Sequence, residues 1–182
     1  VGVGIIPAWG GCKEYLGRVK EFGLVSNGPM GAVMKAFEVI GTAQVAKSAN
    51  QARSMGFLGP NDRITMNRDR LLYDAKKTLI QLSLKYSPPE PRTYSLPGPS
   101  GKAALELAVN DLLLSGKVTP HDVVVTNALA GILTGGDTDI TESINEDDIL
   151  VMEKNAITTL AKNTDTLDRM QHMLETGKPL RN

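Results

Sequence analysis

The apolar residues of this 182-residue chain recur mostly at the three- and four-residue spacing of amphipathic helices. A first helix is predicted over residues 10–22, entered through Gly10 and Gly11. Its inward residues are expected to be Tyr15, Leu16, Val19 and Phe22. A second helix is predicted to begin at Pro29, which suits a first turn. Its inward residues are expected to be Met30, Val33, Met34, Phe37 and Ile40.

The middle of the chain predicts one short helix, one long helix and a stiff connector. Ser48 caps the short helix, which Gly56 ends, and a turn at Pro60 and Asn61 follows. The long helix covers residues 68–85, and its expected inward stripe is Leu71, Leu72, Ala75, Leu79 and Leu82. Five of the ten prolines fall in residues 86–101, which predicts an extended connector without secondary structure of its own.

The last eighty residues predict four further helices. Ser100 or Gly101 opens the first, which Gly116 closes. The next is capped by Thr119, with Pro120 in its first turn, and runs to about Leu133. Its VVVT run, residues 123–126, favours a strand by propensity, but the flanking caps indicate a helix.

The remaining two helices follow a capping box and end at a glycine. Ser143 and Glu146 are expected to form an S-x-x-E capping box before the first of them. The final helix ends at Gly177 and carries an apolar stripe that we expect to pack internally or against a neighbour. The stripe consists of Leu167, Met170, Met173 and Leu174.

Together these patterns predict a mostly α fold with a few short strands. The chain divides into a first region of loop and helices, residues 1–85, a Pro-rich connector, residues 86–101, and a carboxy-terminal helical region, residues 102–182. Twenty basic residues balance twenty acidic ones, so no overall charge attracts nucleic acid or an anionic membrane. A single cysteine and the lack of a spanning apolar run favour a cytoplasmic location. Because the sequence opens at Val1, we expect a piece of a longer chain.

The glycine-rich opening VGVGIIPAWGG is the first candidate for chemistry. Gly2-Val3-Gly4 lacks the third glycine and the preceding strand of a dinucleotide fingerprint, which disfavours that interpretation. In residues 7–11, a proline and two glycines lead into a helix start whose free N–H groups suit a carbonyl or an anion. An ordinary tight turn with Trp9 in the core explains the same residues equally well.

A resemblance to a known family extends this interpretation. GIIPAWGGCKEYLGR, residues 4–18, resembles the G-x-x-P-G-x-G-G segment of the crotonase superfamily, which includes enoyl-CoA hydratases and isomerases. Residues 153–182 are similar to the tail of bifunctional 3-hydroxyacyl-CoA dehydrogenases of fatty-acid β-oxidation, whose crotonase domain is carboxy-terminal. RITMNRDRLLYDAK, residues 63–76, also resembles that group.

The resemblance implies that this chain is the helical carboxy-terminal half of a crotonase-type α/β domain. In that family, this half oligomerises and covers the acyl-CoA site, so a homo-oligomer and the missing upstream half are the implied partners. Two N–H groups and two glutamates carry out hydration in the family's hydratases, and all four would lie upstream of Val1. No catalytic residue, metal or cofactor is therefore expected in this chain.

The substrate contacts implied by the resemblance are in the opening loop. Pro7, Gly10 and Gly11 occupy family positions, Ala8 stands where glycine is common, and Trp9 is bulkier than usual. These five residues are expected to wall the acyl pocket. Lys76 and Lys77 on the long helix, and Lys178 and Arg181 in the tail, are candidate partners for CoA phosphates.

The histidines, the cysteine and one pair of aspartates are expected to have structural rather than catalytic or metal-binding roles. His121 and His172 are far apart and indicate helix positions rather than a metal site. Cys12 lies at a helix start, which favours a thiolate, but no base accompanies it. Asp137 and Asp139 predict a solvated turn rather than a calcium loop.

The sequence therefore leads to two functional hypotheses. In the first, the whole protein acts on fatty acyl-CoA thioesters, hydrating the 2-enoyl form and oxidising the 3-hydroxy form with NAD, and this chain alone is inactive. In the second, the chain is a helical oligomerisation or interaction module with a vestigial acyl-CoA pocket.

Overall fold

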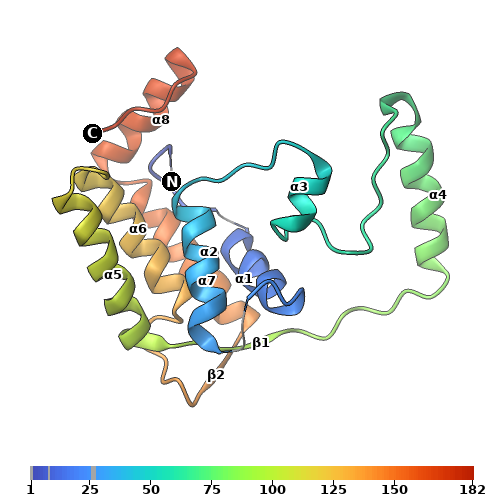
Figure 1. Cartoon of the computed structure of the whole chain (residues 1–182), viewed down its shortest axis with the longest axis horizontal. Helices are drawn as coiled ribbons and strands as arrows, with labels where there is room; N and C mark the ends of the chain where they lie inside the picture. The colour runs from blue at the N-terminus through green and yellow to red at the C-terminus, as the bar shows by residue number, and fades with distance from the viewer. Residues whose placement is uncertain (1, 8, 26–27) are drawn as a thin grey trace.

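The fold is a helical body from which one helix projects (Figure 1). A computed structural model describes residues 2–7, 9–25 and 28–182. The helices are α1 (Gly11–Glu21), α2 (Pro29–Gly41), α3 (Ala49–Ser54), α4 (Leu71–Ser83), α5 (Gly98–Leu114), α6 (Pro120–Leu133), α7 (Glu146–Leu160) and α8 (Thr164–Thr176), with the short 3-10 helix η1 (Arg68–Arg70) before α4. Strands β1 (Thr93–Ser95) and β2 (Ser143–Asn145) complete the described elements, which confirms a mostly α fold with a few short strands.

Helix α1 lies at the centre of the body, where it packs against α2, α6 and α7. Its predicted apolar face is confirmed for Tyr15, Leu16 and Val19, which are buried in the main core, whereas Phe22 lies just beyond the helix and is half-buried. Cys12 belongs to the same face and is fully buried. One face of α1 packs in the core, and its outer side forms a wall of the candidate site.

The buried face of α2 differs from the predicted stripe. The residues that it buries are Ala32, Val33, Ala36 and Val39, of which only Val33 was expected. Small side chains let α2 approach α1 and α6 closely, and this packing turns Met34 out to solvent. The larger residues of the predicted stripe therefore flank the contact instead of filling it.

The two strands join the connector to the carboxy-terminal region. They pair antiparallel, with Tyr94 opposite Ile144, and Tyr94 is buried. The expectation of a connector without secondary structure is wrong for its second half, because residues 93–95 form β1 and α5 already begins at Gly98. Gly98 has a positive φ of 62° and a Cβ there would overlap the Thr138 carbonyl oxygen, so this helix start requires glycine.

The capping signals were located correctly for α6 and wrongly for α7. The predicted Thr119 cap is confirmed, with Asp122 completing a capping box, and the VVVT run is helical as expected. For α7, the box is formed by Asn145 and Asp148, whereas Ser143 lies in β2. Pairing of β2 with β1 holds Ser143 extended, so the N-cap is Asn145, two residues beyond the expected one.

Within this chain α8 is held by polar contacts and its apolar stripe is at most half-buried, while packing of that stripe against a neighbour stays a prediction. Leu167 and Leu174 are exposed, and the residues that α8 buries are Thr166 and Arg169. The Arg169 guanidinium donates to the Asp122 carboxylate at 2.7 Å, to the Thr119 hydroxyl at 2.9 Å and to the side-chain oxygen of Asn182 at 2.6 Å. Arg169 therefore ties α8, the start of α6 and the tail together.

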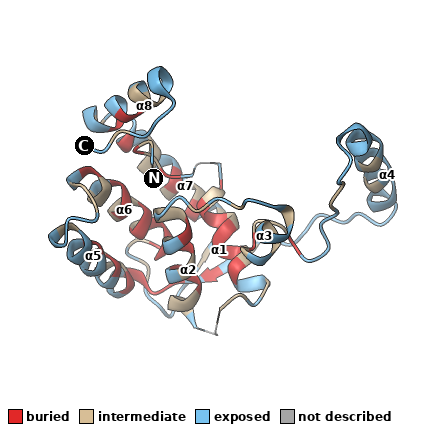
Figure 2. Cartoon of the chain, turned by 45° about the horizontal axis from the view of Figure 1, so that its top comes forward, coloured by how far each residue is buried: buried red, intermediate tan, exposed pale blue. Residues whose placement is uncertain are grey.

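Helix α4 stands apart from the body on two extended segments (Figures 1 and 2). None of its residues is buried. The expectation that the apolar stripe of α4 faces inward is therefore wrong, since all five residues of the stripe are exposed. They are Leu71, Leu72, Ala75, Leu79 and Leu82.

No helix among the described residues is both long and apolar enough to span a membrane.

Replacing Arg169 by Met is expected to lower the free energy of unfolding by about 3 kcal/mol, because the Asp122 carboxylate loses its buried partner and the tail loses its anchor. Urea denaturation followed by circular dichroism measures this change. The control is Lys162→Met, which removes a positive charge at an exposed residue in the turn between α7 and α8. Equal losses for the two variants would show that Arg169 does not anchor α8.

Candidate functional site

An open cavity of about 500 Å³ lies beside the opening loop. One wall is the outer side of α1, and the other is formed by the end of α2 and the segment that leads through α3. The lining residues are Pro7, Gly11, Glu14, Tyr15, Arg18, Val39, Ile40, Ala43, Gln44, Val45 and Phe57. Most of this surface is apolar, with polar groups at Glu14, Arg18 and Gln44, which is the usual character of a small-molecule site.

The loop wall depends on close packing between Pro7 and Gly11. A Cβ at residue 11 would come within 2.6 Å of the Pro7 Cβ, so no larger residue fits without displacing the proline. The Cys12 thiol also donates to the Pro7 carbonyl oxygen at 3.4 Å. These contacts fix the loop against the first turn of α1.

The opposite wall is attached to α1 by two side chains that also line the cavity. The Tyr15 hydroxyl donates to the Met55 carbonyl at 2.8 Å, and the Arg18 guanidinium donates to the Phe57 carbonyl at 2.7 Å. The rings of Tyr15 and Phe57 are in contact, with centroids 5.3 Å apart. The segment after α3 is thereby held at a fixed distance from α1.

Backbone strain is concentrated beside this cavity. Among the described residues, Trp9 and Ala43 are the non-glycine residues with positive φ, at 58° and 52°. Ala43 lines the cavity, and Trp9 lies in the loop between Pro7 and Gly11. Such conformations are unfavourable for residues with a Cβ and cluster at functional sites, so they mark this cavity as a candidate functional site.

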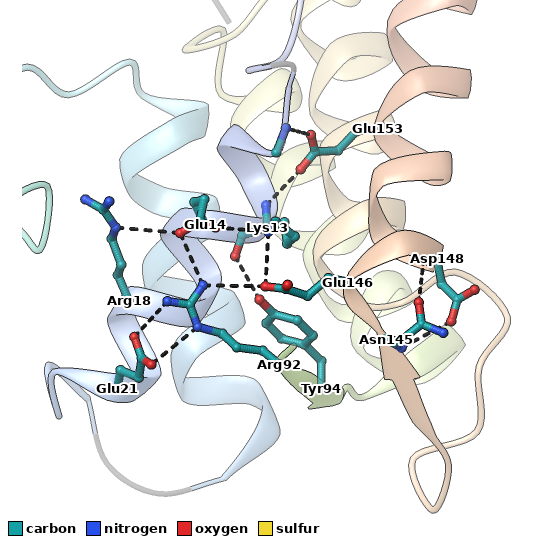
Figure 3. A network of polar contacts seen from close by, with 11 residues as sticks. Lys13, Glu14, Arg18, Glu21, Arg92, Tyr94, Asn145, Glu146, Asp148 and Glu153 are labelled. Atoms are coloured by element: carbon teal, nitrogen blue, oxygen red, sulfur yellow. Dashed lines mark hydrogen bonds and ion pairs between the residues drawn. The ribbon is translucent and has the colours of Figure 1, made fainter. Parts of the chain in front are cut away.

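The Glu153 carboxylate of α7 accepts hydrogen bonds from backbone N–H groups at the start of α1 (Figure 3). Its carboxylate accepts from the Gly10 N–H at 2.7 Å and from the Lys13 N–H at 2.8 Å, and the side chain is buried. Gly10 is the N-cap and has no side chain to perform this role. The expectation that these N–H groups await a ligand anion is therefore wrong, because the chain supplies its own carboxylate.

A charged network continues from this cap along α1 and across to β1 (Figure 3). The Lys13 ammonium contacts Glu14 at 2.9 Å and Glu146 at 3.0 Å. Arg92 donates to Glu14 at 3.2 Å and to Glu21 at 2.9 Å. The network fixes the polar edge of the cavity to α7 and to the connector.

The same contacts determine the ionisation of Glu14. Burial by itself would raise the pKa of Glu14, but hydrogen bonds from Lys13 and Arg92, together with their positive charge, outweigh burial and hold that pKa below its ordinary value. Glu14 is therefore an ionised hydrogen-bond acceptor at neutral pH. A carboxylate of this kind is a poor general base, so Glu14 is suited to accepting hydrogen bonds rather than protons.

The structure brings only part of the predicted loop site to the cavity. Pro7 and Gly11 line it, whereas Gly10 faces α7, where a Cβ would contact Leu150. Trp9 is 99% exposed, so the interpretation that places it in the core is wrong. Ala8 lies outside the described residues.

The candidate CoA-phosphate residues do not converge. Lys76 and Lys77 lie on α4, while Lys178 and Arg181 follow α8 at the other end of the molecule (Figures 1 and 2). Arg181 donates to the Lys117 carbonyl at 2.9 Å. One phosphate group cannot contact both pairs within a single copy of this chain.

The remaining singled-out residues have structural roles. Burial, reinforced by the charge of Glu153, raises the pKa of the Cys12 thiol, so the helix start does not produce a thiolate. Asp139 accepts from the backbone N–H and the hydroxyl of Thr141, which makes a local turn. The Gly4 carbonyl accepts from the Thr166 hydroxyl, and a Cβ on Gly4 would crowd the Thr166 backbone.

Sequence reasoning missed Glu153 and Arg92. A signal for Glu153 was present, because it falls four residues after Ile149 and seven before Leu160, on the buried face of α7. A lone carboxylate on an apolar face needs a buried donor, and a nearby helix start supplies two. Arg92 offered no such signal within the proline-rich connector.

His121 makes the stability of this region pH-dependent. Its Nε2 is 2.8 Å from the Thr166 hydroxyl, and its buried Nδ1 has no hydrogen-bond partner among the described residues. Burial lowers the pKa of His121 and the Arg169 charge lowers it further, against the opposing charges of Asp165 and Asp122. The folded protein therefore binds this proton less readily than the unfolded chain.

The free energy of unfolding is therefore expected to be largest above about pH 6.5, the ordinary histidine pKa, and to fall towards pH 5.5 by at most about 1.4 kcal/mol per pH unit. The His121→Gln variant should flatten this slope, whereas His172→Gln should keep it. Urea titrations at several pH values measure both. An unchanged slope in His121→Gln would contradict the assignment.

Comparison with known proteins shows a relative that matches this chain throughout its length. The chain is 39% identical over 183 residues to the probable 3-hydroxyacyl-CoA dehydrogenase of Bacillus subtilis (strain 168). The alignment covers all of this chain but only 23% of that protein. No protein-family model matches the chain, and no solved structure matches it. The chain is thus similar throughout its length to about a quarter of a probable 3-hydroxyacyl-CoA dehydrogenase.

Proposed function

We propose that this chain is part of a 3-hydroxyacyl-CoA dehydrogenase and that the cavity beside Pro7 and Gly11 receives the acyl portion of a CoA thioester. The observation that carries the proposal is the position of these two loop residues in the wall of a mostly apolar cavity. The similarity to the Bacillus subtilis protein supports the substrate class. Val39, Ile40 and Phe57 offer the apolar surface that an alkyl chain requires.

In this proposal the whole protein oxidises the 3-hydroxyacyl form with NAD. The described residues of this chain do not fit a dinucleotide site, because residues 2–7 contain no strand and Gly4 packs against Thr166. NAD would therefore be bound by another part of the whole protein. We assign no step of hydride transfer to this chain.

The proposal further places the chain in the helical half of a crotonase-type domain, with hydration of the 2-enoyl form as a second activity of the whole protein. Trp9 and Val45 support this arrangement, since both are exposed beside the cavity, at 99% and 77%. Such side chains are the surface that an upstream half of the domain would cover. The chain alone is then inactive, and hydration of a short enoyl-CoA by the purified 182-residue chain would contradict that part.

The second candidate is an interaction module in which the cavity is vestigial. The exposed apolar stripe of α4 favours it, because this helix buries nothing within one copy of the chain. The two candidates differ in what they predict for the cavity. Only the first predicts that filling the cavity changes the binding of a thioester.

The test is calorimetric titration of hexanoyl-CoA into the whole protein carrying Ile40→Phe. The aromatic ring should narrow the cavity at the apolar wall and weaken binding about tenfold or more, a difference of about 1.4 kcal/mol. The matched control is Val151→Phe, which adds the same ring at an exposed position of α7 and should leave binding unchanged. Identical titration curves for the two variants would overturn the acyl-pocket assignment and favour the interaction module.

A further inference from the structure

The cavity beside the opening loop has two charged side chains in a mostly apolar surface. Helix α1 lines the cavity with one face, whose residues recur at three- and four-residue spacing: Gly11, Glu14, Tyr15 and Arg18. The other lining residues are uncharged. Glu14 and Arg18 are therefore the charged groups that an acyl chain in this cavity meets.

Glu14 and Arg18 lie close together without a hydrogen bond between them (Figure 3). The Arg18 Nε is 3.8 Å from the Glu14 Oε2, which is longer than the limit of about 3.2 Å for an N–H···O hydrogen bond. One oxygen atom can lie about 2.8 Å from both of these atoms. If that oxygen belongs to a hydroxyl, it accepts a hydrogen bond from Arg18 and donates one to Glu14. The spacing of the pair therefore suits a hydroxyl group.

Both side chains keep hydrogen-bonding capacity for a ligand. A guanidinium has five N–H donors, and among the described residues Arg18 donates to the Phe57 carbonyl. The Glu14 carboxylate accepts from Lys13 at one oxygen and from Arg92 at the other, whereas two carboxylate oxygens offer about four acceptor sites. The Glu14 and Arg18 side chains are 41% and 37% exposed, so a ligand in the open cavity can reach them.

The charges around the pair favour a neutral polar group over an anion. Glu14 and Arg18 have opposite charges, so the lining of the cavity is neutral as a whole. An anion placed at Arg18 lies against the ionised Glu14 carboxylate, which repels it. A hydroxyl carries no charge and can satisfy the donor and the acceptor together.

We propose that Glu14 and Arg18 recognise a hydroxyl group on the acyl chain, so that the cavity binds a 3-hydroxyacyl-CoA in preference to a thioester without this hydroxyl. This recognition rests on the proposed function, because it requires the acyl portion to enter the cavity. Glu14 is about 4.5 Å further along the axis of α1 than Gly11. A chain whose thioester end lies at the loop thus brings its third carbon near the pair and its tail towards Ile40 and Val45.

The test is an NMR titration of the 182-residue chain with 3-hydroxyhexanoyl-CoA and, separately, with hexanoyl-CoA. The two ligands differ only in the hydroxyl, so the ratio of their dissociation constants measures its recognition apart from that of CoA and the alkyl chain. Amide shifts of the lining residues Gln44 and Phe57 report binding at this cavity. The hydroxy compound should bind about tenfold more tightly, because its hydroxyl contacts two charged groups.

Three variants assign the preference to the pair. Glu14→Met and Arg18→Met each remove one member and should reduce the preference to about twofold or less. The matched control is Glu21→Met, which removes another carboxylate partner of Arg92 from α1 but does not line the cavity. It should keep the tenfold preference. A variant that merely displaces the cavity wall weakens both ligands alike and leaves the ratio unchanged.

The possible results separate this recognition from the acyl-pocket assignment. Equal affinities of the two thioesters for the unaltered chain overturn the recognition of a hydroxyl and leave the acyl pocket standing. A preference that persists in Glu14→Met, or that Glu21→Met abolishes as well, also overturns it. Lining amides that shift with neither thioester overturn the acyl pocket and the recognition together.

Discussion

The contact between Glu153 and the start of α1 is the constraint on which the rest of the structure depends. Gly10 adopts a left-handed conformation that glycine allows without strain, and it leaves the helix without an N-cap side chain. Glu153 supplies the missing acceptor from α7, 140 residues further along the chain. A buried carboxylate and unsatisfied helix N–H groups are each unfavourable alone, and here each satisfies the other. The opening loop is thereby fixed to the carboxy-terminal helices.

Helix α1, held in this way, contributes residues both to the core and to the cavity. Its inner face joins the core through Leu16 and Val19, and its outer face carries Glu14 and Arg18 to the cavity. Lys13 and Arg92 connect the polar edge of that cavity to α7 and β1, so the site is positioned by residues far apart in sequence. The projecting α4 is built differently, because it buries nothing in its own chain. The molecule therefore combines a cavity wall held by core and polar contacts with a helix that buries none of its residues.

The sequence predicted the elements that depend on local signals. Helix α1, with Tyr15 and Val19 inward, and α6, with its Thr119 cap, follow from periodicity and capping chemistry. Periodicity also found α4, but an apolar stripe does not reveal what covers it, and the inward direction assigned to Leu72 was wrong. The N-cap of α7 is Asn145 and not the predicted Ser143, because Ser143 pairs with β1 as part of β2. For the site, local sequence indicated Pro7 and Gly11, which line the cavity, and their contact with a substrate stays a prediction. Glu153 and the anchor of Arg169 on Asp122 depend on contacts between distant segments, which no short window contains.

The most direct test of this account is amide hydrogen exchange in the Glu153→Gln variant, followed by NMR. The neutral amide turns one acceptor into a donor, so the Gly10 and Lys13 amides should lose protection, and the free energy of unfolding should fall by about 2 kcal/mol. The exposed Glu175→Gln variant on α8 should change neither quantity. If Gly10 and Lys13 keep their protection in Glu153→Gln, and its stability matches that of the control, Glu153 does not hold the start of α1.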